Sequence, residues 1–272
     1  MELVHFITVH YREKMLIDQL EQLGYPHKPD KLTGIADYQI KLSDEQYEEA
    51  RKLIDQYKPF GVIGTIFEPE EILNAEWNRF WVLHEWGYPQ PEDGYKYQEI
   101  TYERICLKCG IGYKQVKSFH IKGKPKMGRN PFFSLYWEKT NFCIPEVVET
   151  LKQNGITGYE VWDAINHSTG EPWSTVYQLV FPAITEPGLD ESDKGKPETC
   201  QVCGRTKYEY HRRGMMKYRR DALKDVDIQE TYEWFGSGGA TAYREVLVSN
   251  RLTRLIIEQG WRGIALRPVE LI

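Results

Sequence analysis

The apolar positions of the first sixty residues alternate between strand and helix spacing. Residues 3–11 alternate loosely between apolar and polar side chains and predict a strand. Residues 13–25 carry leucine and isoleucine at helical spacing, and Gly24 ends this predicted helix. A second helix is predicted over residues 43–57, with Ser43 as its N-cap and Gln46 completing a capping box. Together these segments predict an N-terminal unit that contains both helices and strands.

The rest of the chain also carries strand and helix patterns. Strands are predicted over residues 60–67 and 77–86, followed by a segment rich in proline and glycine at 87–97. A helix is predicted over 145–155, and a strand, helix and strand over 243–271, the helix capped by Ser249 and ended by Gly260. We therefore expect an α+β fold with mixed or antiparallel sheets and a few helices. The segment at 87–97 divides it into an acidic α/β unit, residues 1–100, and a second α+β domain, residues 101–272.

The composition places the chain among ordinary globular proteins. Hydrophobic residues make up 41% and charged residues 28% of the 272 positions, so disorder is not expected. No run approaches the roughly 18 apolar residues that a membrane helix needs, and the first residues, MELVHFITVHYREK, lack the features of a secretory signal. We expect a cytoplasmic protein without a membrane partner, in which paired cysteines are metal ligands more often than disulfides.

Four of the five cysteines fall in two copies of one pattern. CLKCG spans residues 106–110 and CQVCG spans residues 200–204. Each CxxC turn directs two thiolates at one ion, and the glycine that follows relieves crowding where backbone N–H groups approach the sulfurs. Cys106, Cys109, Cys200 and Cys203 are therefore predicted to hold one structural Zn²⁺ in a zinc-ribbon-like site that joins the two distant knuckles.

Other interpretations of the cysteines remain open at this stage. The two pairs could form independent knuckles, or a pair could act as a redox dithiol. His120 and His211 lie near the knuckles but are expected to be ordinary histidines, because four cysteines already complete a tetrahedral site. The chain contains no GxxxxGK[ST], HExxH or GxSxG motif, and no pair of carboxylates stands out. We predict no catalytic residues and no enzyme activity.

Charge is distributed unevenly along the chain. Residues 1–100 contain 10 basic and 19 acidic residues, a net charge of −9, whereas the whole chain carries −5. Residues 105–130 contain no acidic residue, and a second basic cluster follows Cys203. This division is compatible with an acidic unit that meets a basic partner, with a basic face that meets an acidic one, or with solvated faces that balance each other.

The order of these motifs resembles that of the double-CXXCG motif proteins, a family of paralogues first noticed in myxobacteria. The resemblance covers residues 101–272 and rests on both CxxCG motifs, on Arg205 directly after the second, and on the strand, helix, GxxG and strand at the C-terminus. It implies that the four cysteines bind metal and that the protein is an immunity protein, which neutralises a toxin delivered by a neighbouring cell. The first hundred residues match nothing in that family.

The expected partner is thus a cognate toxin. If the toxin has a basic cleft, acidic side chains of the N-terminal unit could dock there and accelerate association. The candidate contacts are Glu68, Glu70, Glu71, Glu92 and Asp93. The alternative is a zinc-ribbon protein that binds nucleic acid, because basic residues alternate with aromatic ones around both knuckles.

Overall fold

The computed structural model describes most of the chain and divides it into two compact units. It describes residues 1–30, 33–83, 85–86, 101–103, 106–112, 114–135, 138–236, 239 and 242–272. The first unit comprises Met1–Glu71 with Arg212–Met215, and the second comprises Ile72–His211 with Met216–Ile272. The segment at 87–97, the predicted boundary, lies outside the described residues.

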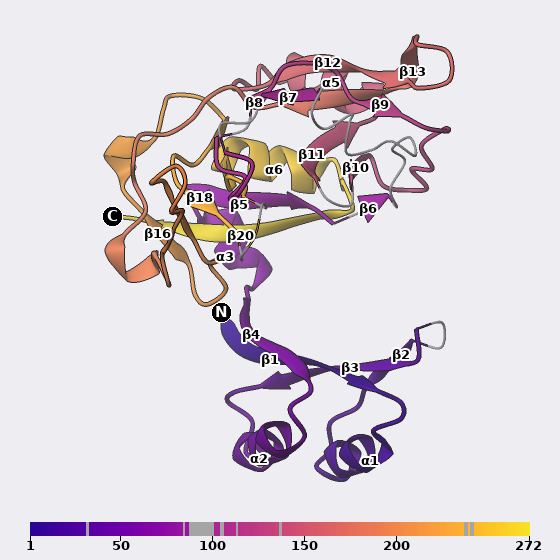
Figure 1. Cartoon of the computed structure of the whole chain (residues 1–272), viewed down its shortest axis with the longest axis vertical. Helices are drawn as coiled ribbons and strands as arrows, with labels where there is room; N and C mark the ends of the chain where they lie inside the picture. Colours follow the sequence, from indigo (N-terminus) through magenta and orange to yellow (C-terminus); the bar gives the residue numbers. More distant parts are fainter. Residues whose placement is uncertain are drawn as a thin grey trace. The chain divides into compact units, whose positions relative to one another are not determined.

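The first unit is a four-stranded antiparallel sheet with two helices on one face (Figure 1). Its strand order is β2-β3-β1-β4. Its elements are β1 (Glu2–His10), α1 (Lys14–Gln22), β2 (Lys28–Asp30), β3 (Ile35–Lys41), α2 (Tyr47–Tyr57) and β4 (Phe60–Ile66). This βαββαβ succession with the edge strands β2 and β4 is the ferredoxin-like, split βαβ arrangement.

Alternation along the strands explains why the helices cover only one face. Ile7 and Val9 of β1 and Tyr38 of β3 point to the same side, where they form one cluster with Leu16 and Leu20 of α1. All five side chains are buried, so the helical spacing seen in the sequence marks the face of α1 that meets the sheet.

The start of α2 differs from the prediction. We expected Ser43 to cap it, but the helix begins at Tyr47, and Gln46 at its N-cap makes no capping hydrogen bond. The hydroxyl of Ser43 instead donates to the carboxylate of Glu2 at 3.1 Å. The predicted capping box is wrong because Ser43 lies in a turn ahead of the helix, in which the Asp44 N–H donates to the carbonyl of Lys41 at 3.2 Å.

The second unit contains two larger sheets. The five-stranded sheet has the order β16-β20-β5-β19-β17, and the six-stranded sheet has the order β6-β10-β11-β13-β12-β9. The strands of the first are β5 (Trp77–Val82), β16 (Met216–Tyr218), β17 (Ile228–Glu230), β19 (Val246–Ser249) and β20 (Ile264–Leu271). Those of the second are β6 (Glu85–Trp86), β9 (His120–Ile121), β10 (Phe132–Leu135), β11 (Glu138–Cys143), β12 (Glu160–Asn166) and β13 (Pro172–Val180). Mixed and antiparallel sheets with few helices confirm the expected α+β class.

The central place of β5 explains where the first unit ends. This strand pairs antiparallel with both β19 and β20, so residues 77–82 belong to the sheet of the second unit. The N-terminal segment of the first unit therefore stops at Glu71, within the short helix α3 (Pro69–Asn74), and is shorter than the 1–100 unit that composition suggested.

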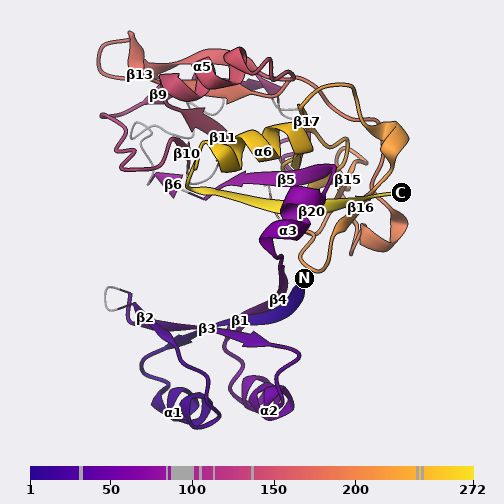
Figure 2. The same ribbon diagram turned by 180° about the vertical axis from the view of Figure 1, so that it is seen from behind.

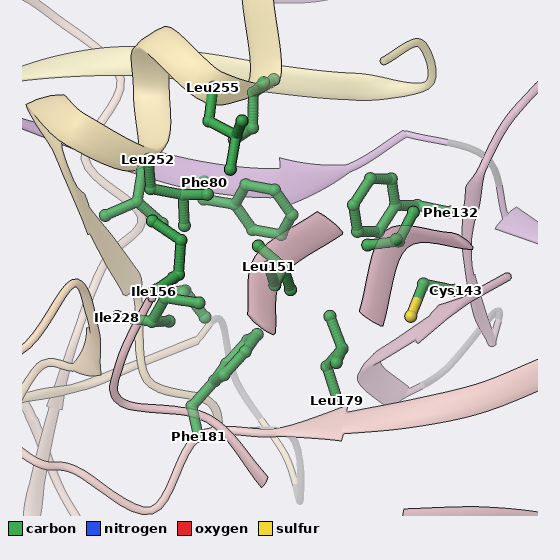
Figure 3. Close-up of a cluster of buried hydrophobic side chains, with 14 of the residues drawn as sticks. Phe80, Phe132, Cys143, Leu151, Ile156, Leu179, Phe181, Ile228, Leu252 and Leu255 are labelled. Carbon is green, nitrogen blue, oxygen red and sulfur yellow. The ribbon is translucent and has the colours of Figure 1, made fainter. Parts of the chain in front are cut away.

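Two helices complete the core of the second unit. They are α5 (Pro145–Gln153) and α6 (Asn250–Glu258), and α6 lies between the two larger sheets in both views (Figures 1 and 2). Leu151 of α5 and Leu252 of α6 point into one apolar cluster with Phe80 of β5 and Leu179 of β13 (Figure 3). The predicted cap of α6 is confirmed, since the hydroxyl of Ser249 accepts from the backbone N–H of Leu252.

Candidate metal centre

Each CxxCG motif lies between two short antiparallel strands. The first lies between β7 (Tyr102–Glu103) and β8 (Lys114–Gln115), which pair with each other. The second lies between β14 (Glu198–Thr199) and β15 (Thr206–Tyr208), which also pair with each other. Behind the second hairpin, β15 continues its sheet through β18 (Trp234–Phe235). Two hairpins that each present a cysteine turn are the building plan of a zinc ribbon.

The two turns have the same backbone geometry. Gly110 has φ of 75° and its N–H donates to the carbonyl of Cys106 at 3.0 Å. Gly204 has φ of 70° and its N–H donates to the carbonyl of Cys200 at 2.8 Å. This left-handed conformation is strained for side chains with a Cβ, so the repeated glycine is a requirement of the turn.

The four sulfurs gather in one cluster. The Sγ atoms of Cys106 and Cys200 are 3.8 Å apart, and those of Cys109 and Cys203 are 3.7 Å apart. All four lie within 4.8 Å of one another, and none is in a disulfide. A tetrahedron with zinc–sulfur bonds of about 2.3 Å has edges of about 3.8 Å. The two pairs therefore form one shared group with the spacing of a four-thiolate metal site, and not two separate knuckles.

Three of the four cysteines are shielded from solvent. Cys106, Cys109 and Cys200 are buried, and Cys203 is partly exposed. The fully buried Ile111 and the partly buried Trp234 pack against the sulfurs. A closed set of four sulfurs suits a structural ion, because a catalytic site keeps one coordination position open.

The local electrostatics favour a cation among the sulfurs. Backbone N–H groups of Cys203 and Val202 lower the pKa of Cys200 to about 6, and the Val202 N–H lies 3.4 Å from its Sγ. Burial, together with the neighbouring cysteine sulfurs, raises the pKa of Cys109 to about 12. Four thiolates at this spacing would repel one another. A divalent ion bound between them would compensate that repulsion and allow all four thiols to lose their protons.

The two histidines near the knuckles do not join the sulfurs. His120 lies on β9 beside His167, with ring centroids 6.0 Å apart. His211 is buried and accepts, through its carbonyl oxygen, a hydrogen bond from Arg79 at 3.1 Å. Burial and the charge of Arg79 lower the pKa of His211. Within the described residues, the cysteine cluster is the one group of three or more metal-ligating side chains.

The structure places the five acidic candidates for partner binding in different environments. Glu68 and Glu70 are exposed near the start of α3. Glu71 is engaged within its own unit, because its carboxylate accepts from the Glu68 N–H at 2.8 Å and lies 2.6 Å from the amino group of Met1. Both contacts lower its pKa. Glu92 and Asp93 lie outside the described residues.

Sequence reasoning missed a cavity of about 850 Å³ in the second unit. It lies beside the cysteine cluster, and its charged lining includes Glu230 and Arg244. These residues come from separate segments that share no motif or spacing with the knuckles. Only the pairing of the strands brings them together, so no signal in the sequence singled them out.

Comparisons with known proteins return no relative of this chain. The chain matches no family model, no curated protein and no solved structure. No helix in the described part of the chain is long and apolar enough to span a bilayer.

Proposed function

We propose that the four cysteines bind one structural Zn²⁺. The observation that carries this proposal is the spacing of the sulfurs, 3.7–3.8 Å for the two cross-knuckle pairs, which equals the edge of a zinc–thiolate tetrahedron. Such an ion would fasten the hairpin at residues 102–115 to the hairpin at 198–208. Zinc content by elemental analysis of freshly purified, reduced protein tests this, and one ion per chain is expected. A metal-free but folded protein would rule the zinc proposal out.

We further propose that the protein is an immunity protein that binds a cognate toxin in the cytoplasm and blocks it. Support comes from the two CxxCG knuckles, from Arg205 directly after the second, and from the C-terminal segment, which forms β19, α6 and β20 in the order that the family resemblance implies. A closed structural ion is also compatible with a binding role, because it rigidifies a surface without supplying a reactive centre.

Coexpression with toxins encoded next to this gene tests the immunity proposal. Growth that depends on the chain, together with a complex isolated from both proteins, is the expected result. Toxicity that persists with every neighbouring toxin, at full expression of folded protein, would contradict it.

The acidic surface is best tested by charge reversal. Removing residues 1–100 would also remove β5, the central strand of the five-stranded sheet in the second unit, so loss of protection after that deletion would be uninformative. Glu68→Lys with Glu70→Lys changes two exposed residues, one directly before α3 and one in its first turn, and is expected to slow association with the toxin. Glu48→Lys with Glu49→Lys, at the first turn of α2, is the matched control with the same charge change. Equal association rates for both variants would remove Glu68 and Glu70 from the interface.

Nucleic-acid binding is the second candidate. One observation favours it: Lys108, Lys114 and Arg205 are exposed on or beside the two knuckles. Binding to phosphates would weaken steeply with salt. A gel-shift titration at low salt with single- and double-stranded DNA and RNA tests this, and absence of a shift at protein concentrations of about 10⁻⁴ M, the weak end of non-specific binding, would dispose of it.

A further inference from the structure

The cavity beside the metal centre lies entirely within the second unit. Its volume of about 850 Å³ falls in the range of sites that hold small organic ligands, roughly 300–1,000 Å³. Side chains of β8, β11, β12 and β13 line it from the six-stranded sheet and the first knuckle. Side chains of β17, β18 and β19, with Arg205 of the second knuckle, line it from the other side.

Three basic side chains line this cavity, and in the described part of the chain no carboxylate lies within ion-pair distance of them. They are Lys114, Arg205 and Arg244, and none of them forms an ion pair within the described part of the chain. Elsewhere in the same unit, Arg79 and Arg220 each form an ion pair with a glutamate. Cations that converge on a cavity without a partner are the usual way in which a protein recognises an anion.

Arg244 is held in a fixed orientation. Its guanidinium carbon lies 4.6 Å from the centre of the Trp234 ring, and one of its terminal nitrogens, Nη1, donates to the carbonyl of Thr231 at 3.0 Å. Stacking and one hydrogen bond use only part of the five N–H donors of a guanidinium, so the rest remain for a ligand. A preorganised arginine loses little conformational entropy when it binds.

The carboxyl group of Glu230 does not cancel this positive charge. Burial raises its pKa to about 7, and the charge of Arg244 opposes that shift. Near neutral pH the group therefore carries only part of a negative charge. The other acidic side chain of the lining, Glu160, accepts a hydrogen bond from the indole of Trp162 at 3.0 Å. The lining thus retains a net positive charge.

The remaining walls suit the body of an organic molecule. Aromatic and apolar side chains make up a large part of them: Tyr102, Trp162, Leu179, Phe181, Trp234 and Tyr243. At one edge the amides of Gln115 and Gln178 donate to each other at 2.9 and 2.7 Å, which ties β8 to β13. Hydrogen bonds therefore connect walls of the cavity that come from different strands.

We propose that this cavity binds a small organic anion, in which an apolar or aromatic body carries a carboxylate or a phosphate. The anionic group lies against Arg244, with Arg205 and Lys114 at its side, and the body lies between the aromatic walls. This site is distinct from the cysteine cluster, because none of the four cysteines lines the cavity.

Calorimetric titration of the full chain tests the site with matched probes. The probes are 3-phenylpropionate, phenyl phosphate, the neutral 3-phenylpropionamide and the cationic 3-phenylpropylamine. At least one of the two anions is expected to bind about tenfold tighter than the amide and the amine, the difference that one charge-assisted hydrogen bond provides. Preference for phenyl phosphate or for 3-phenylpropionate identifies the anionic group. Tighter binding of the amine, or equal binding of all four probes, would overturn the proposal.

Substitutions of cavity residues then test whether the anion binds in this cavity. Arg244→Gln keeps a side chain that can donate to Thr231 but removes the charge, and it is expected to weaken anion binding about tenfold. Arg205→Gln changes an exposed residue and should leave the protein folded. It is also expected to weaken anion binding, so it tests the site even if Arg244→Gln does not fold. Arg262→Gln, at an exposed position outside the cavity lining, is the control and should leave affinity unchanged. Anion affinity that survives both Arg244→Gln and Arg205→Gln would place the site elsewhere.

Discussion

The Sγ atoms of Cys106 and Cys200 lie 3.8 Å apart, although 94 positions separate the two residues in the chain. An ion bound between them closes a loop of that length, and between them the chain builds β9 to β13 and α5. The six-stranded sheet is thus largely contained within the loop. Without such an ion, the two hairpins would lose this direct link to each other.

Replacing one ligand should therefore remove both the metal and a large part of the stability. Cys200→Ser is expected to lose zinc and to lower the free energy of unfolding by about 4–5 kcal/mol, the chain-entropy value for a cross-link that closes a loop of about 100 residues. Urea unfolding and elemental analysis of the same sample measure the two effects.

Cys143→Ala is the control for this prediction. Cys143 is fully buried on β11 but does not belong to the cluster, so the variant should lose some stability and keep one zinc per chain. Equal zinc content in Cys200→Ser and Cys143→Ala would show that the metal binds elsewhere.

Gly158 marks a close approach of two backbones. It has φ of 91°, and a Cβ built on it would lie 2.1 Å from the carbonyl oxygen of Ile228 on β17. Gly158→Ala should therefore cost at least about 3 kcal/mol, as severe local strain does. Gly170→Ala is the matched control, because φ is 75° there and nothing lies within 4 Å of the added Cβ, so a cost of about 1–2 kcal/mol is expected. Similar costs at both sites, measured by urea unfolding, would contradict the contact.

Local signals in the sequence predicted much of the fold and the cysteine cluster. The helical spacing of Leu16 and Leu20, the cap at Ser249 and the CxxCG turns all depend on residues a few positions apart, and the structure has each of them. The repeated glycine pointed to two equal turns. Two turns of the same kind, which together supply four sulfurs, were enough to predict that the two cysteine pairs lie in one cluster.

What the sequence could not predict depends on contacts between distant segments. The start of α2 was predicted too early because residues 42–46 form a turn after β3, in which Ser43 bonds to Glu2 of β1. The place of β5 was missed because its partners, β19 and β20, lie more than 160 residues further on. The positions of Glu230 and Arg244 in one cavity follow from the pairing of β17 with β19, which no short pattern encodes.

The buried ion pair between Arg79 and Glu245 should show strong coupling. The two charged groups are 3.2 Å apart, with side chains that are 1% and 0% exposed. Arg79→Met leaves the carboxylate of Glu245 buried and without its cation, which should cost about 3–5 kcal/mol. Arg79→Met combined with Glu245→Met should cost clearly less than the two single changes added together, because neither charge is then stranded. A double-mutant cycle in urea measures this, and additive effects would mean that the pair contributes nothing.

The raised pKa of Glu230 should make stability depend on pH in a defined direction. Because burial raises the pKa of this carboxyl group from 4.5 in an exposed glutamate to about 7, the folded chain holds a proton that the unfolded chain releases. The contribution of Glu230 to stability is therefore fully present below pH 4.5 and is lost as pH rises toward 7 and above. Glu230→Gln keeps the neutral form at every pH, so its melting temperature relative to the wild type should rise between pH 5 and pH 8, by several degrees. Glu258→Gln, on the exposed end of α6, is the control and should show no such trend. A difference between Glu230→Gln and wild type that stays constant from pH 5 to pH 8 would mean that Glu230 is ionised throughout, and that Arg244 outweighs its burial.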